Sequence, residues 1–172
     1  MALADLPQNP SSTTNLPVAI AGFERISFKD YRNEGPELGV SYGYKAASGV
    51  TATVYIYNWG LAEIPTGIES QPLKKLHAQT VSEILQFGAR RGMAFEHTLK
   101  TSISVPTRSG KKNALVDAFV AKDGKGQTDT FLWLWAASNN FFKIRLTASP
   151  EDVFDRKEIA SFAAEVIRIS YE

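Results

Sequence analysis

The sequence contains no cysteine, which excludes disulfides, thiol catalysis and cysteine-based metal sites. It also lacks an excess of charge of one sign, because 19 basic and 18 acidic residues leave a net charge of +1. This balance argues against nucleic acid or an anionic membrane as the main partner. No apolar run approaches the roughly 18 residues of a membrane-spanning helix, since the longest dense stretch, residues 131–137, has the length of a strand.

The sequence motifs of common enzymes are missing as well. The chain has no G-x-S-x-G motif, no P-loop and no G-x-G-x-x-G motif. The segment Asp123-Gly124-Lys125-Gly126 predicts a hairpin turn, and the carboxylates between residues 151 and 158 fit the start of a helix. We therefore expect no cofactor, no metal site and no catalytic set.

The chain has the size and composition of one globular domain, with 172 residues of which 44% are hydrophobic and 22% are charged. Its N-terminal segment is rich in Pro, Ser, Thr and Asn, which predicts a flexible tail at residues 1–19 and a single α/β domain at residues 20–172. Within the tail, Ala2-Leu3-Ala4 has the small-x-small pattern of a signal-peptidase site. This pattern leaves a periplasmic or secreted location as open as a cytoplasmic one.

Apolar residues that recur with a period of two predict about seven strands. Three strands precede a long helix and four follow it as a meander, at residues 23–28, 38–44, 50–59, 95–105, 114–122, 128–138 and 141–148. The strand at 128–138 is apolar on both faces, which is typical of a central strand covered on both sides.

A period of 3.6 predicts two helices. The long helix covers residues 73–91 with Pro72 in its first turn, and its apolar stripe includes Phe87. The C-terminal helix carries an apolar stripe over residues 159–169 and is expected to start at Asp155, whose side chain would cap it.

These elements together predict an α+β fold with a mostly antiparallel sheet. Their order, and the aromatic strand pair in FLWLWAASNNFFKIRLTASPED before the last helix, resemble the PsbP-like family. The resemblance covers about residues 20–170. It implies an α/β/α sandwich and a small non-enzymatic binding or accessory domain, in bacteria often exported. The alternative is a cystatin-like or nuclear-transport-factor-like curved sheet, in which the helix lies across a cone that holds a ligand.

The only two histidines, His77 and His97, are candidates for a shared site. His77 lies near the middle of the apolar stripe of the long helix, and His97 lies on the apolar face of the following strand. A small enzyme or a metal-dependent site built on this pair is one alternative function, although neither residue lies in an HExxH or comparable motif. We prefer a structural interpretation, in which each ring forms a hydrogen bond to a backbone carbonyl.

Aromatic side chains supply candidates for ligand binding. Tyr57 and Trp59 share one strand face, and Trp133 and Trp135 share another. Placed side by side, these rings would line a pocket for an apolar or ring-bearing ligand. Core packing is the commoner reason for such faces, and Trp59 is the best exception because it sits at a strand end beside a long loop.

A basic region lies between residues 70 and 112, where eight basic residues accompany two acidic ones. It would form an anion-binding face, whereas a solvated helix surface followed by a basic hairpin explains the same charges without a partner. The candidates for this face are Arg90, Arg91, Arg108, Lys111 and Lys112.

These observations favour a non-enzymatic binding domain that recognises a protein partner or a small apolar or ring-bearing ligand. The histidine site and the anion-binding module are the two alternatives. The sequence does not predict an oligomeric state.

Overall fold

Eight antiparallel strands form one open sheet in the computed structural model, which describes residues 15–172. The strands are β1 (Ala19–Ile20), β2 (Phe23–Asp30), β3 (Val40–Ala46), β4 (Thr51–Tyr57), β5 (Glu96–Thr107), β6 (Gly110–Asp123), β7 (Gly126–Ala137) and β8 (Asn140–Ala148). Their order across the sheet is β1-β2-β3-β4-β8-β7-β6-β5. The predicted α+β fold with a mostly antiparallel sheet is confirmed, as is the meander from β5 to β8.

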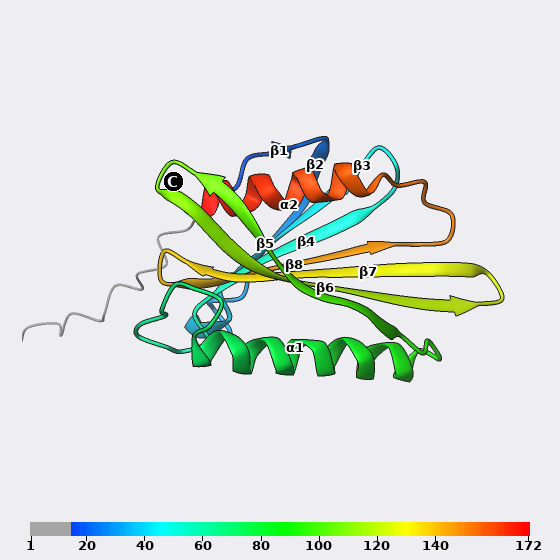
Figure 1. The fold of residues 1–172 in the computed structure, drawn as a ribbon, viewed down its shortest axis with the longest axis horizontal. Coiled ribbons are helices and arrows are strands. Elements are labelled where there is room, and N and C mark those ends of the chain that lie inside the picture. Colours follow the sequence, from blue (N-terminus) through cyan, green and yellow to red (C-terminus); the bar gives the residue numbers. More distant parts are fainter. Residues whose placement is uncertain (1–14) are drawn as a thin grey trace, which may run out of the picture.

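Two helices cover opposite faces of the sheet (Figure 1), α1 (Gln71–Arg90) on one face and α2 (Arg156–Ser170) on the other. Helix α1 begins at Ser70, whose side chain accepts a hydrogen bond from the Leu73 N–H. Helix α2 begins where the sequence predicts, because the Asp155 carboxylate accepts a hydrogen bond from the Lys157 N–H at 2.9 Å. Neither helix in this part of the chain is long and apolar enough to cross a membrane.

The central position predicted for β7 is confirmed. This strand lies between β6 and β8, and its two faces contact different helices. Leu132 and Leu134 pack in the clusters that contain residues of α1, while Trp133 and Trp135 pack in the large core that contains residues of α2. Each face of β7 is therefore covered, as its apolar residues require.

The packed domain begins earlier in the chain than residue 20. Leu16 is only 2% exposed and belongs to the core under α2, and the Tyr44 hydroxyl donates a hydrogen bond to the Pro17 carbonyl at 2.7 Å. Leu16 and Pro17 therefore belong to the packed domain, and β1 begins at Ala19, the last residue that composition assigns to the tail. The Ala2-Leu3-Ala4 pattern lies outside the described residues.

The expected strand at residues 38–44 starts two residues later in the structure. Leu38 ends a short 3-10 helix, η1 (Pro36–Leu38), and is 46% exposed. Gly39 then turns the chain into β3 with a φ of 65°, and a Cβ at this position would lie 1.9 Å from the Ile56 carbonyl oxygen. The close approach of β4 explains why only glycine fits here.

Strand β5 departs from the simple alternation that its sequence predicts. A register shift between His97 and Leu99 pairs His97 with Phe119 and Leu99 with Ala118. Consecutive residues of β6 point to opposite faces of the sheet. The shift therefore places His97 and Leu99 on opposite faces, although the sequence predicts them on one face. His97 thus turns toward α1, whereas Leu99 is 44% exposed.

Candidate functional site

A groove runs along one flank of α1, where the helix leaves the neighbouring part of the sheet open. Three pockets with volumes of about 460, 220 and 420 Å³ form it. Trp59 lines both the first and the second pocket, and Tyr55 and Glu83 line both the second and the third. The three pockets are therefore parts of one groove.

One stripe of α1 forms the helical wall of this groove. Its residues recur every three or four positions, which is the spacing of one helix face. A 20-residue helix is about 30 Å long, so the groove follows most of that length. The stripe consists of Gln71, Lys75, Gln79, Glu83, Gln86 and Arg90.

Strands β4 and β8 form the floor of the groove. Tyr55 lies opposite Lys143 in the sheet register, and Tyr57 lies opposite Phe141. Directly opposed residues project to the same face, so tyrosines and cations alternate under the helix. The Lys143 ammonium lies 4.7 Å from the ring centroid of Tyr55 and 5.6 Å from that of Tyr57, which is within the range of cation–π attraction.

The two cations of β8, Lys143 and Arg145, lack a direct ionic or hydrogen-bonding partner in the part of the chain that the structure describes. Neither forms an ion pair or a hydrogen bond there, and Arg145 Nε is buried without any hydrogen-bond partner. Burial lowers the pKa of Lys143 and of Arg145 from their ordinary values, and Glu83 acts in the opposite direction on both. The floor of the groove therefore holds positive charge at a cost in free energy.

A tight turn holds Trp59 at one end of the groove. Its backbone has a φ of 54°, which is uncommon for a residue other than glycine. Hydrogen bonds from the Trp59 N–H to the Glu37 carbonyl and from the Gly60 N–H to the Asn58 carboxamide oxygen fix this turn. The half-buried indole then faces Lys75, whose ammonium lies 5.9 Å from the ring centroid. Strained backbone of this kind is concentrated at functional sites.

The four predicted aromatic candidates do not lie side by side. Tyr57 and Trp59 line the groove, whereas Trp133 and Trp135 point to the opposite face of the sheet and are 4% and 0% exposed. The Trp135 indole N–H donates a hydrogen bond to the Ser170 hydroxyl at 2.9 Å, beneath α2. Trp133 and Trp135 therefore pack in the core, as the preferred interpretation predicts, and the alternative of one pocket lined by all four rings is wrong because the two pairs occupy opposite faces of the sheet.

The two histidines meet on the other flank of α1, at a carboxylate that the sequence analysis missed. His77 Nε2 lies 2.6 Å from Asp117 Oδ2, and His97 Nε2 lies 2.7 Å from Asp117 Oδ1. Asp117 is fully buried in β6, and the His97 ring stacks on Phe119 with centroids 4.6 Å apart. One carboxylate thus connects α1 to β5 and β6.

The predicted hydrogen-bond partners of the two histidines are wrong. Each ring bonds to a shared side chain rather than to a backbone carbonyl. The signal that could have indicated it is the lone acid in the apolar stretch ALVDAFV, since a buried carboxylate needs partners. Neither this cluster nor any other group of His, Asp and Glu in residues 15–172 has an arrangement that could hold a metal ion.

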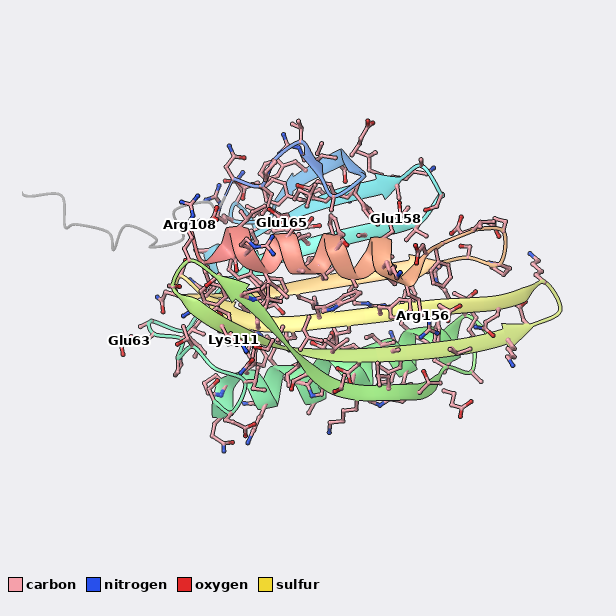
Figure 2. All side chains as sticks on the ribbon, turned by 45° about the horizontal axis from the view of Figure 1, so that its top comes forward. Glu63, Arg108, Lys111, Arg156, Glu158 and Glu165 are labelled. Carbon is pink, nitrogen blue, oxygen red and sulfur yellow. The ribbon has the colours of Figure 1, made fainter. Side chains whose placement is uncertain are left out.

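The basic candidates are divided between separate places. Arg90 lines the groove, and the Arg91 guanidinium lies 4.4 Å from the ring centroid of Phe87. Figure 2 shows Arg108 and Lys111 near the hairpin between β5 and β6. This hairpin lies far from the C-terminal end of α1 (Figure 1). These candidates therefore do not form the single anion-binding face that is the alternative to a solvated helix surface and a basic hairpin.

The remaining basic candidate and the predicted helix stripe need similar corrections. Lys112 lies over the Tyr171 ring with its ammonium 5.0 Å from the centroid, and so belongs to the end of α2 rather than to α1. Phe87 is 49% exposed and lines the groove, although the helical stripe places it in the core. Its neighbour Gly88 takes the buried position, because a Cβ there would lie 2.3 Å from the Phe95 ring.

Comparison of the sequence with models of protein families finds no match, and comparison with curated proteins finds no similar chain. The groove and the histidine cluster on the two flanks of α1 therefore remain the places to look for a function.

Proposed function

We propose that the chain is a non-enzymatic binding domain that holds a small ring-bearing ligand in the groove along α1. The observation that carries this proposal is the continuous row of aromatic rings, Tyr55, Tyr57 and Trp59, that runs through three connected pockets. Two of these pockets, at about 460 and 420 Å³, lie in the 300–1,000 Å³ range typical of small-molecule sites.

The row of aromatic rings favours a ring-bearing ligand in particular. Tyr55, Tyr57 and Trp59 are all half-buried, so each ring keeps part of its surface accessible. A planar ligand would cover that surface by offset or edge-to-face stacking, which contributes about 0.5–1.5 kcal/mol per ring pair beyond area burial. The Gln79 and Glu83 side chains on α1 supply polar groups that would orient such a ligand.

The histidine cluster supports a binding domain over the alternative of a small enzyme. Both Nε2 atoms are bonded to Asp117, which is fully buried. The bonds join one helix to two strands, so the cluster connects α1 to β5 and β6. A helix on each face of an antiparallel sheet is also what the resemblance to the PsbP-like family implies, and that resemblance carries the proposal of a binding or accessory role.

Nuclear magnetic resonance of the full chain tests this proposal, because its three tryptophans give three indole N–H signals. The probes are benzamide, indole and 3-phenylpropanamide, all neutral aromatic compounds. We expect at least one of them to shift the Trp59 signal and to leave the Trp133 and Trp135 signals in place, since these two lie in the core.

Trp59→Gly is the matched variant, because glycine adopts the positive φ of this turn without strain. It removes the ring and identifies the Trp59 signal. We expect it to weaken binding by about tenfold, the loss of roughly one stacked ring. The proposal would be contradicted if none of the probes moved the Trp59 signal, or if binding were unchanged in Trp59→Gly.

A further inference from the structure

The charges that line the groove do not cancel. In the second and third pockets, the cations are Lys143, Arg145 and Arg90, and the carboxylates are Glu37 and Glu83. Three positive and two negative side chains leave one positive charge in these two pockets, and Lys75 adds a further one only in the first pocket. A ligand with a single negative charge would neutralise the second and third pockets, whereas a dianion bound there would leave an excess of negative charge.

Arg145 is the group in this set that most requires a partner. Its Nε is buried and has no hydrogen-bond partner among the described residues. A buried donor without a partner costs free energy, and the same side chain lines the third pocket, where a ligand could reach it. The planar guanidinium fork fits two oxygens of one carboxylate.

Arg90 brings a second guanidinium to the same pocket from the last turn of α1. Tyr55 and Phe87 complete the pocket, which has a volume of about 420 Å³. Two guanidinium groups and two aromatic rings therefore surround one space, and Glu83 offsets one of the two positive charges.

Resting on the proposed ring-binding function, we propose that the ligand is an aromatic monocarboxylate, whose carboxylate binds Arg145 and Arg90 while its ring packs along Tyr55 and Tyr57. The Lys143 ammonium, which lies near both tyrosine rings, adds positive charge next to the bound ligand. The ring would then occupy the middle of the groove and the carboxylate the end nearest the C-terminus of α1.

Calorimetric titration of the full chain with three matched probes tests this inference. The probes are 3-phenylpropionate, its neutral amide 3-phenylpropanamide, and phenyl phosphate, which is mainly a dianion at neutral pH. We expect the carboxylate to bind at least about tenfold more tightly than the amide, through charge-assisted hydrogen bonds. Phenyl phosphate should bind more weakly than the carboxylate.

Three variants localise the effect. Arg145→Met should remove the preference for the carboxylate and leave the affinity for the amide unchanged, and Arg145→Lys should keep part of the preference because it retains the charge without the fork. Arg108→Met is the matched control, since this side chain is 89% exposed on the distant hairpin. It should change neither affinity.

The outcomes separate this inference from the proposed function. Equal affinity for the acid and the amide, tighter binding of phenyl phosphate, or an unchanged preference in Arg145→Met would overturn the inference. If neutral compounds still shifted the Trp59 signal, the groove would remain a ring-binding site. If no aromatic compound shifted it, the inference and the proposed function would both fail.

Discussion

Buried charge has hydrogen-bonding partners on one flank of helix α1 and, in the described part of the chain, no ionic or hydrogen-bonding partner on the other. On one flank, Asp117 is fully buried and bonded to two histidine rings. On the other flank, Lys143 and Arg145 are largely buried and form no ion pair with the described residues. Removing one partner of a buried charge pair lowers stability, whereas a buried charge without a partner lowers stability already in the parent chain. The flank that contains Lys143 and Arg145 is therefore the one suited to a ligand.

The largest expected effect comes from disrupting the hydrogen bonds between Asp117 and the two histidines. Asp117→Asn removes the charge and one of the two acceptors that the histidines share. We expect the free energy of unfolding to fall by about 3 kcal/mol, as for a buried pair that loses one partner. Urea denaturation followed by circular dichroism measures this change.

Asp123→Asn is the matched control for this variant. Asp123 lies in the exposed hairpin turn, where its Oδ1 accepts a hydrogen bond from the Lys125 N–H. Asparagine keeps that acceptor, so the loss should be below about 0.5 kcal/mol. Losses of equal size in the two variants would show that the histidine cluster does not hold α1 in place.

The two histidines should differ in their contributions to stability. The His77 side chain is 11% exposed and the His97 side chain 27% exposed, so the first bond is better shielded from water. We expect His77→Gln to cost about 2 kcal/mol and His97→Gln about 1 kcal/mol, measured in the same urea denaturation assay. The reverse order would mean that β5, rather than α1, depends more on Asp117.

The smallest expected effect has the opposite sign. Lys143→Met keeps a side chain of similar length and removes a charge that burial disfavours. We expect it to raise the free energy of unfolding at neutral pH by about 1 kcal/mol, as at other sites where function opposes stability. It should also weaken the binding of 3-phenylpropionate.

The pH dependence of the Lys143→Met variant checks the cause. Burial lowers the pKa of Lys143 below its ordinary value of 10.5, so the folded chain releases this proton at a lower pH than the unfolded chain. The contribution of Lys143 to the free energy of unfolding therefore rises with pH between the two pKa values. The advantage of Lys143→Met over the parent chain should shrink across that interval, and a constant difference would exclude burial of the charge as its cause.

Local sequence patterns predicted most of the fold. The apolar residues of β7 and the cap at Asp155 act through neighbours along the chain, and both lie where expected. The exceptions have local causes as well. Gly88 sits beneath the Phe95 ring at a position that admits no Cβ, which leaves the neighbouring Phe87 at the edge of the groove.

The site depends on long-range register and was predicted only in part. Tyr57 and Trp59 were found from their strand face, but Asp117 was missed because it meets His77 across 40 residues of sequence. Lys143 and Arg145 were missed because a strand that alternates cations with apolar residues usually exposes its polar face to water. Here α1 and the tyrosines of β4 cover much of that face, which no local pattern of residues 140–148 indicates.

The stability of Arg145→Met tests the contrast between the two flanks most directly, because it needs no knowledge of the ligand. We predict that the free energy of unfolding of Arg145→Met, measured in urea beside that of Asp117→Asn, equals or exceeds that of the parent chain. This follows because the buried Nε of Arg145 has no partner to lose. A loss of about 3 kcal/mol, as large as that expected for Asp117→Asn, would contradict the account and make Arg145 a part of the fold.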